Sequence, residues 1–507
     1  MPITRMRTIA VLLALAVSAL TASGHTAQQG NDEPLFRVRV NAPDVAALHA
    51  RLAAAGYDVL VADAEHSTIE LAVSRAEWRG LEAGGHHVIL VDRARPLQEA
   101  LRPPTDAAAS GAMELSATAA AVAPPTYPNL DAVLDRMQNI ATAYPAIAQL
   151  VDITAAYNTP PTSEGRHLFA LKISDNVTID EDEPAMLIVS AHHAREITTP
   201  LISLGAADRL TAGYASDARI ASAVDGHEIW IAPVWNPDGY NHVFASDNLW
   251  RKNRSIFAGG VGVDQNRNYP VGWNGPCSGS TSVGSETYKG PSPASEAETQ
   301  TLMTWSQRER FAKVIDYHSY GREVLYAYRC LAHPFTSWMQ QEATALSLAS
   351  GYGGSTRLPS ADGEHQEWQF ARMGAYAFLI ETHTQFQPSY DSAVSEATLV
   401  WPGILSVLER PITITGHVTD VRTGAPLSAS IELLNVTFSN AEVNASGGAY
   451  GTYHMFLPPG TYDIRFSAPG YTPTISRVTV TATSITVMDV PLTPLEPAPP
   501  QNLRIVG

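Results

Sequence analysis

The sequence predicts an α/β protein with a further β-rich domain at its C-terminal end, and two patterns lead to this prediction. Over residues 127–410, amphipathic helical segments alternate with fully apolar strands, which is typical of a layered α/β domain with a buried sheet. After residue 410 the helical periodicity stops, and short alternating strands separated by Gly and Pro follow. At 507 residues the chain is long enough for two to four domains, each with its own core.

A smaller unit precedes the α/β domain. LFRVRV, YDVLVAD, STIELAVS and HHVILVDR alternate like strands, whereas PDVAALHARLAAAG and RAEWRGLEAGG carry helical apolar stripes. The order βαββαβ predicts a ferredoxin-like domain within residues 28–102. Residues 103–126 are rich in Ala, Pro, Ser and Thr and cannot bury enough apolar surface to order themselves, so we expect a linker there.

Five apolar segments are expected to form strands of the central domain: HLFALKIS, AMLIVSA, HEIWIAPVWN, FAKVIDYHS and AYAFLIETH. In an open α/β sheet, binding sites gather where strands end and loops begin. The later segments, from ITGHVTDV to SRVTVTATSITVMDV, predict a small β-sandwich over residues 411–495, and residues 496–507 are interpreted as a tail.

The N-terminal segment has the order of a secretory signal peptide. Arg5 and Arg7 precede the apolar run IAVLLALAVSAL, and small residues follow in TASGHTA. We therefore expect residues 1–27 to be removed near Ala27, and the mature protein to be secreted or periplasmic. The apolar run is too short to cross a membrane and no other segment reaches the required length, so no membrane span is expected.

Charge and cysteine content narrow the possible functions further. The 33 Lys and Arg against 50 Asp and Glu give a net charge of −17, which argues against a nucleic-acid partner. The sequence has two cysteines, Cys277 and Cys330. Two cysteines in an exported protein most often pair, and two unpaired buried thiols are the alternative.

Candidate metal ligands lie near the ends of two apolar strands. SAHHAREITTP (190–200) places His193 three residues before Glu196, but His192 is four residues before the same Glu and could also converge with it. His318 ends the buried strand IDYHSY. Since catalytic zinc needs three protein ligands and an open position, these residues could form one site, although their spacing leaves the choice of histidine open.

A carboxylate inside an apolar strand is a further signal. FLIETH places Glu381 among apolar residues, where it is costly unless it is paired or used in chemistry. A buried ion pair is the structural alternative for such a residue.

Taken in order, several motifs resemble the M14 zinc carboxypeptidases. These are HAREITTP, NPDGY, LWRKNRS, GVDQNRNYP, SETYKGPSPASEAET, IDYHSY and FLIET. The resemblance covers roughly residues 127–410 and implies the mixed-sheet catalytic domain of that family. The unit at 35–102 is similar to the family's ferredoxin-like propeptide, and the C-terminal strands resemble the transthyretin-like, or carboxypeptidase regulatory-like, domain found in some members.

The family pattern His-Ala-Arg-Glu selects His193 over His192. The resemblance then implies one zinc ion held by His193, Glu196 and His318. Asp264 would hydrogen-bond to a ligand histidine and fix its tautomer.

The resemblance also implies catalytic and substrate-binding roles. Glu381 would be the general base for a zinc-activated water, and Arg251 would stabilise the oxyanion. The C-terminal carboxylate of the substrate would be held by two residues, Asn266 and Arg267. Arg195 would bind substrate further along the groove.

The sequence departs from the family near its specificity pocket. The mobile tyrosine that the family usually carries before the catalytic Glu is absent from LPSADGEHQEW. Alignment from His318 makes Arg329 a pocket residue and favours acidic C-terminal residues. Counting back from Trp368 instead places Gln366 on the pocket floor near two carboxylates, Glu364 and Glu367, which would suit Lys or Arg. Of the two, an acidic or mixed preference is the one we expect.

The expected function is that of a secreted zinc metallocarboxypeptidase that removes single C-terminal amino acids from peptides. The expected partners are a peptide or protein with a free C-terminal carboxylate and an activating protease. Because no Lys or Arg lies between Arg102 and Arg136, we expect activation by a cut after Arg102 or by a protease that prefers small residues. Alternatives are a cell-wall peptidase on the same fold and a non-catalytic peptide-binding protein.

Overall fold

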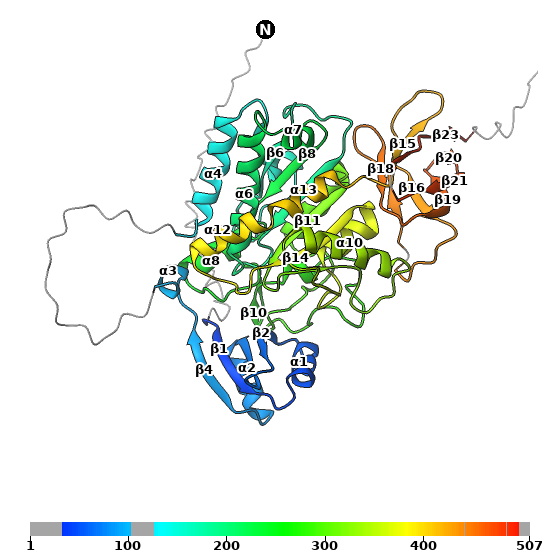
Figure 1. Ribbon diagram of the computed structural model, residues 1–507. Helices are drawn as coiled ribbons and strands as arrows, with labels where there is room; N and C mark the ends of the chain where they lie inside the picture. Colours follow the sequence, from blue (N-terminus) through cyan, green and yellow to red (C-terminus); the bar gives the residue numbers. More distant parts are fainter. Residues whose placement is uncertain (1–32, 103–125, 441, 483, 496–507) are drawn as a thin grey trace, which may run out of the picture.

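The computed structural model describes residues 33–102, 126–440, 442–482 and 484–495, which form three domains along the chain (Figure 1). The expected signal peptide, the expected tail and all but the last residue of the expected linker lie outside these residues. Within them, no helix is both long and apolar enough to cross a membrane.

The N-terminal domain has the predicted βαββαβ order. Its elements are β1 (Phe36–Asn41), α1 (Val45–Ala54), β2 (Asp58–Asp63), β3 (Thr68–Val73), α2 (Arg75–Ala83) and β4 (Val88–Arg93), followed by the short α3 (Leu97–Ala100). The strands form one antiparallel sheet in the order β2-β3-β1-β4. Asp44 caps α1 through the Ala47 N–H, and Ser74 and Glu77 form a capping box at the start of α2, which fixes both helix starts.

The central domain is built on the mixed sheet that the sequence resemblance implied. Its eight strands follow the order β13-β12-β14-β11-β7-β8-β6-β5, in which β14, β11, β7 and β8 are parallel and β5, β6 and β12 run antiparallel to neighbours. The bounds are β5 (Ala148–Asp152), β6 (Phe169–Ile173), β7 (Ala185–Ser190), β8 (Glu228–Ala232), β11 (Lys313–Ser319), β12 (Glu323–Leu325), β13 (Thr356–Arg357) and β14 (Tyr376–Thr382).

Helices cover both faces of this sheet. Alternate residues of β7 point into two cores: Ile188 packs in one with Ile202 of α6 (Thr198–Gly213), and Leu187 packs in the other with Trp305 of α9 (Ala297–Glu309). All residues of β7, β8 and β11 are buried, as expected for parallel strands between helical layers. The longer helices are α4 (Leu130–Ala143), α6 (Thr198–Gly213), α7 (Ala218–Val224), α8 (Pro237–Ala245), α9 (Ala297–Glu309), α10 (Thr336–Ala349), α12 (Tyr390–Leu399) and α13 (Trp401–Glu409).

Short elements fill the connections of the central domain. They are α5 (Ile153–Ala156), β9 (Ile256–Phe257), β10 (Gly260–Val261), the 3-10 turn η1 (Gln265–Arg267), α11 (His365–Trp368) and the π-turn η2 (Gln369–Met373). Two of them, η1 and α11, lie in the loops that supply site residues.

The C-terminal domain is a β-sandwich, as predicted. One sheet has the order β18-β15-β23-β20 with β22 beside β15, and the other has the order β17-β16-β19-β21. Their inner faces share a core that includes Tyr453 and Phe466. The strands are β15 (Ile414–Asp420), β16 (Ser430–Leu433), β17 (Asn444–Ala445), β18 (Thr452–Met455), β19 (Gly460–Ser467), β20 (Tyr471–Thr472), β21 (Thr474–Val480), β22 (Thr486–Val487) and β23 (Val490–Pro494).

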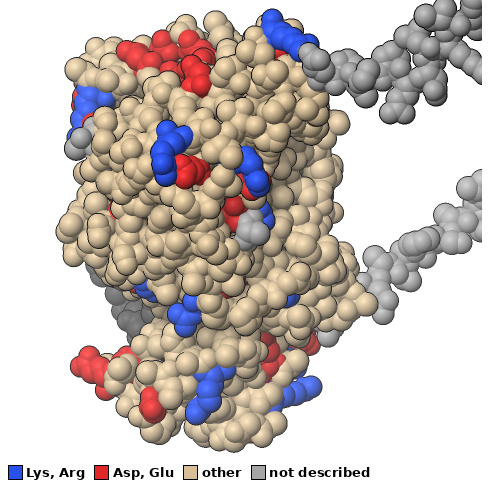
Figure 2. Space-filling model, turned by 90° about the vertical axis from the view of Figure 1, so that its right-hand side faces the viewer, with Lys and Arg blue, Asp and Glu red and all other residues tan. Residues whose placement is uncertain are grey.

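The N-terminal domain lies against the central domain, at the bottom of Figure 1 and as the lower lobe of Figure 2. Across this boundary the Leu35 N–H donates to Asp247 at 2.9 Å, and the Ser285 hydroxyl donates to the Gly56 carbonyl at 2.6 Å. On the face drawn in Figure 2, acidic and basic side chains occur in small scattered groups.

Candidate active site

The site lies at the carboxyl ends of three neighbouring parallel strands, β7, β11 and β14. After Ser190 the chain leaves β7 through Ala191, which has a positive φ of 53°. The following turn is held by Asn236, whose backbone N–H donates to the Ala191 carbonyl and whose side-chain amide donates to the His192 carbonyl at 3.0 Å. The next residues therefore project over the end of the sheet, where binding sites of open α/β sheets occur.

Three side chains meet there. His193 Nδ1 is 2.7 Å from Glu196 Oε1 and 3.0 Å from His318 Nδ1, and His318 Nδ1 is 3.1 Å from Glu196 Oε2. All three residues are buried, and their ligand atoms lie within 4.8 Å of one another. Two imidazole nitrogens and one carboxylate are the donor set of a catalytic zinc with a remaining open position.

The surroundings of the histidines fit zinc as well. His193 Nε2 is 3.1 Å from Asp264 Oδ1, so the ring gives its N–H to a carboxylate and presents a lone pair on Nδ1. Although burial alone would raise it, His193 and His318 hold the pKa of Glu196 below its ordinary value. A carboxyl group that binds zinc must be deprotonated, and this lowered pKa agrees with that role. His193, Glu196 and His318 form the zinc site.

Glu381 borders this cluster. It sits on β14 at the position that pairs with His318 of β11 in the parallel register. Burial, and then Glu196, raise the pKa of Glu381 to about 7, while His318 and Arg357 act in the opposite direction. Its Oε1 lies 3.7 Å from Arg357 Nη2, and its buried Oε2 has no hydrogen-bond partner among the described residues.

Arg251 is anchored beside the zinc ligands. Its Nε and Nη2 donate to Asp264 Oδ2 at 3.0 and 2.9 Å, and its Nη1 lies 4.0 Å from Glu196 Oε1. Burial alone would raise the pKa of Asp264, but Arg251 and then His193 hold it well below its ordinary value. Asp264 thus joins Arg251 to His193 in one buried charge network.

Asn266 and Arg267 occupy η1, on the other side of His318. Asn266 Nδ2 lies 3.3 Å from His318 Nε2, and Asn266 Oδ1 accepts the His365 N–H at 2.8 Å. Arg267 Nη1 donates to Glu364 Oε1 at 2.8 Å, whereas the buried Arg267 Nε has no partner in the described part of the chain. Arg267 Nε is therefore available to another anion.

The N-terminal domain reaches this site through Arg195. Arg195 Nη2 donates to Asp58 Oδ1 at 2.9 Å, and Arg195 Nη1 also bonds to Asp58. The guanidinium lies 4.3 Å from the ring centre of Phe386, and the Tyr320 hydroxyl donates to the Leu60 carbonyl. Arg195 and Tyr320 thus face the N-terminal domain.

Arg329 forms no side-chain hydrogen bond to these residues within the described part of the chain, but it contacts Asp362, a carboxyl group that also interacts with Arg267. Arg329 is exposed, and its backbone N–H donates to Asp362 at 2.6 Å. The neighbouring Cys330 forms the predicted disulfide with Cys277, with the Cα atoms 5.8 Å apart. Gln366, the other pocket candidate, is buried and donates to Glu364 Oε2 at 2.5 Å.

Sequence reasoning did not identify three residues that the structure brings to the site. Asp316 lies behind His318, Arg357 lies beside Glu381, and Asp58 pairs with Arg195. Asp316 carried the same signal as Glu381, a carboxylate inside an apolar strand. No local pattern marks Arg357 or Asp58, because their partners are distant in sequence.

Comparisons with known families and proteins agree with this geometry. The family model described as zinc carboxypeptidase matches residues 133–398, and that of the carboxypeptidase regulatory-like domain matches residues 413–493. Carboxypeptidase A1 of Bos taurus is 28% identical over 305 residues, covering 57% of this chain and 70% of that protein. A zinc carboxypeptidase of Saccharothrix mutabilis subsp. capreolus is 32% identical over 266 residues, covering 52% of this chain and 57% of that protein.

Solved structures resemble the fold over more of the chain. The carboxypeptidase A from Helicoverpa armigera has a TM-score of 0.58 at 23% identity, covering 75% of this chain and 97% of that one. Thrombin activatable fibrinolysis inhibitor has a TM-score of 0.56 at 20% identity, covering 74% and 99%. With the family match and the His193, Glu196 and His318 cluster together, the chain belongs to the M14 zinc carboxypeptidase family and is a zinc carboxypeptidase with a regulatory-like domain behind its catalytic domain.

Proposed function

We propose that this enzyme removes single amino acids from the C-terminus of peptides, with Glu381 as the general base. The observation that carries the proposal is the unpartnered buried Oε2 of Glu381 beside the zinc ligands, with a pKa raised to about 7. A carboxylate with a pKa near neutral can both accept and return a proton at working pH. Zinc bound by His193, Glu196 and His318 would supply Lewis-acid activation of water and of the substrate carbonyl.

The chain's own residues provide the other steps. Glu381 would take the proton of the attacking water and deliver it to the leaving amine. Arg251, fixed by two hydrogen bonds to Asp264, would stabilise the negative charge that develops on the carbonyl oxygen. Asn266 and the unused Nε of Arg267 would hold the terminal carboxylate, and this contact would restrict cleavage to the last residue.

Glu364 supports a preference for basic C-terminal residues. It is buried and bonds to Arg267 and Gln366, so its charge is balanced in the absence of substrate. When a substrate carboxylate binds Arg267, the positive charge of Arg267 compensates the Glu364 carboxylate less fully. A Lys or Arg side chain at the C-terminus of the substrate would supply the missing positive charge. The exposed position of Arg329 gives less support to the acidic preference.

The N-terminal domain is proposed to act as an inhibitory propeptide. Asp58 occupies Arg195, the residue expected to bind substrate further along the groove, and Leu60 occupies Tyr320, which packs against the same Phe386 ring as Arg195. Removal of residues up to about 126 by an activating protease would free both. The signal-like residues 1–27 and the Cys277–Cys330 disulfide support secretion or a periplasmic location.

The test uses protein matured by proteolysis and, in parallel, the uncleaved chain. Peptides identical except for the last residue, ending in Arg, Lys, Glu or Leu, are followed by mass spectrometry with and without a zinc chelator. We expect the matured protein to release single residues in a chelator-sensitive way, with Arg and Lys fastest. Zinc-loaded, matured protein that trims none of these peptides would contradict the proposal.

A further inference from the structure

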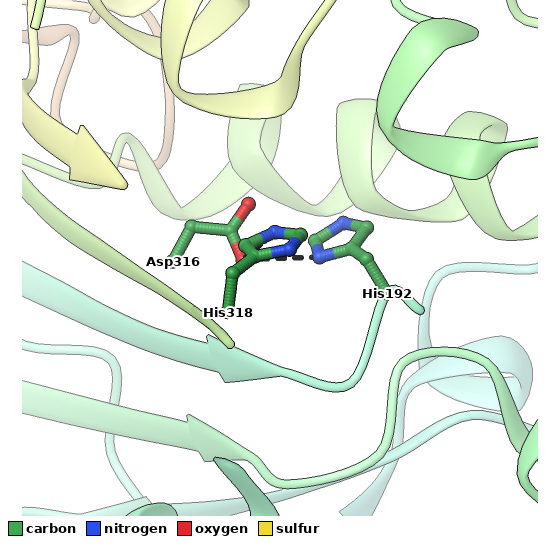
Figure 3. Close-up of side chains that lie close together, drawn as sticks. All are labelled: His192, Asp316 and His318. Carbon is green, nitrogen blue, oxygen red and sulfur yellow. Dashed lines mark hydrogen bonds and ion pairs between the residues drawn. The ribbon is translucent and has the colours of Figure 1, made fainter. Parts of the chain in front are cut away.

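A buried carboxylate lies behind the zinc ligand His318. Asp316 and His318 are two residues apart on β11, so their side chains lie on the same face of the strand. Asp316 is completely buried, and Figure 3 shows it beside His318, with His192 facing the Asp316 carboxylate. The zinc-binding Nδ1 of His318 is on one side of its ring, and Asp316 is on the other.

Three histidines converge on this carboxylate. Asp316 Oδ1 lies 3.2 Å from His318 Nε2 and 3.1 Å from His192 Nδ1, and Asp316 Oδ2 lies 3.0 Å from His365 Nδ1. All three histidines are buried. An anionic carboxylate can accept several N–H groups, so one Asp satisfies one nitrogen of each ring.

The outer nitrogens of two rings determine their tautomers. The Tyr269 hydroxyl can donate to His192 Nε2 at 3.3 Å, and the Gln369 side-chain amide, which also bonds to Ser306, can donate to His365 Nε2 at 2.8 Å. His192 and His365 therefore carry their hydrogens on Nδ1 and give them to Asp316. This assignment leaves Asp316 as an acceptor for the Nε2–H of His318. Asn266 Nδ2 lies 3.3 Å from the same nitrogen but cannot accept that hydrogen, so the charged carboxylate at 3.2 Å is the acceptor.

We propose that Asp316, held in place by His192 and His365, is a positioning residue for zinc. It fixes the tautomer of His318 that presents a lone pair on Nδ1 and holds the plane of that ring toward Glu196 and His193. Asp316 thus accepts the Nε2–H of His318, as Asp264 accepts the Nε2–H of His193. The proposal rests on the zinc site of the proposed function but not on its proton-transfer steps.

The same residues raise a competing possibility, a second metal ion. The ligand atoms of His192, Asp316 and His318 lie within 4.8 Å of one another. The position of His318 opposes it, because this ring would have to bind one ion through Nδ1 and a second through Nε2. Zinc stoichiometry separates the two possibilities.

The experiment measures zinc binding to the full chain by equilibrium competition with a chelator, together with zinc content per chain. In Asp316→Asn the amide oxygen is a weaker acceptor than the carboxylate, and the amide NH2 group faces a histidine N–H. We therefore expect the variant to bind zinc with an affinity about 10- to 100-fold weaker. Glu298→Gln is the matched control: this carboxyl is equally buried but bonds to Asn253, and its raised pKa of about 8 makes the amide a close substitute. It should bind zinc like the wild type.

A second pair of variants tests the same point if Asp316→Asn does not fold. His192→Asn keeps an N–H donor near Asp316 and should retain one zinc with nearly unchanged affinity. His192→Leu removes the donor and should bind zinc more weakly, by about tenfold. The unfolding temperature of the zinc-free forms is measured alongside, because a merely structural role would lower it without changing zinc affinity.

Two results would overturn the proposal. One is an unchanged zinc affinity in both Asp316→Asn and His192→Leu, whatever their stability. The other is two zinc ions per wild-type chain with one lost in His192→Asn, which would make the cluster a metal site. Turnover is recorded separately: a wild-type enzyme that binds zinc but cleaves no peptide would contradict the proposed function and leave this inference standing.

Discussion

Asp58 of the N-terminal domain and Arg195 of the catalytic domain form a buried ion pair across the domain boundary, with Arg195 Nη2 donating to Asp58 Oδ1 at 2.9 Å. Burial alone would raise the pKa of Asp58, but Arg195 holds it below its ordinary value, so the pair is charged. Removing one partner of a buried pair is costly because the other charge is left unbalanced, typically by about 3–5 kcal/mol.

Asp58→Asn should therefore loosen the N-terminal domain from the site. We expect the uncleaved variant to hydrolyse a short peptide at least about tenfold faster than the uncleaved wild type, since only part of the interface is lost. Asp63→Asn, in the same domain but paired with His66, is the control and should not differ from wild type. Equal activity of Asp58→Asn and wild type would argue against inhibition through Arg195.

Glu381→Gln tests the base. The amide keeps the size of the side chain but cannot accept a proton, so turnover should fall by about 10²- to 10⁴-fold. Zinc content should stay at the wild-type level, because Glu381 is outside the set of His193, Glu196 and His318. Steady-state rates and metal analysis of the matured variant check this, and a variant with wild-type turnover would remove Glu381 from the mechanism.

Glu364→Gln tests specificity. Loss of the carboxylate beside Arg267 should lower kcat/KM for peptides ending in Arg or Lys by about tenfold and leave those ending in Leu within about twofold. Arg329→Gln should change neither class. A fall in activity toward peptides ending in Glu for Arg329→Gln would instead favour the acidic preference.

The contact between the sandwich and the catalytic domain should depend on pH. His417 Nε2 is 2.9 Å from Asp182 and Nδ1 is 2.9 Å from Asp489. Partial burial alone would lower the pKa of His417, but the two carboxylates raise it above 6.5. Because the folded-state pKa is raised, this stabilisation is complete below about pH 6.5 and is lost as the pH rises through the folded-state value.

His417→Asn should remove that dependence. The difference in unfolding temperature between wild type and variant should be largest near pH 6 and shrink toward about pH 8, as followed by calorimetry. His49→Asn, an exposed substitution on α1, is the control and should show no such trend. A difference that grows with pH would contradict the assignment.

The disulfide should contribute to stability. Cys277 and Cys330 are 53 residues apart in sequence, and closing a loop of this length lowers the entropy of the unfolded chain. The double variant Cys277→Ser/Cys330→Ser should lose up to about 4 kcal/mol of unfolding free energy. Denaturant titration measures this loss, with reduced wild type as the comparison, and an unchanged midpoint would show that the bond does not limit unfolding.

The fold was largely predictable because its signals are local. The alternation in LFRVRV and the apolar run around Ile315 each specify a strand through a few adjacent residues. Sequence reasoning assigned no helix to α9 or α10, and in α9 most of the buried residues are polar, so no apolar stripe marks the helix. β12 and β13 were also not anticipated, because strands of two or three residues carry too few positions for a periodic pattern.

The zinc ligands could be found only as a set. Spacing did not separate His192 from His193, and the structure shows why both are buried: one faces Asp316 and the other faces Glu196. Pairings such as Arg357 with Glu381 join residues from different strands and depend on sheet order, which local sequence does not contain.

The register between β11 and β14 has a consequence for folding. His318 and Glu381 are directly paired residues of two parallel strands, and a shift of one residue would turn one of the two side chains to the opposite face of the sheet. A chain that collapses with these strands mispaired could reach native-like compactness and secondary structure and still hydrolyse nothing. Recovery of turnover during refolding would then lag behind recovery of the circular dichroism signal. The return of turnover would therefore indicate that β11 and β14 have paired in the correct register.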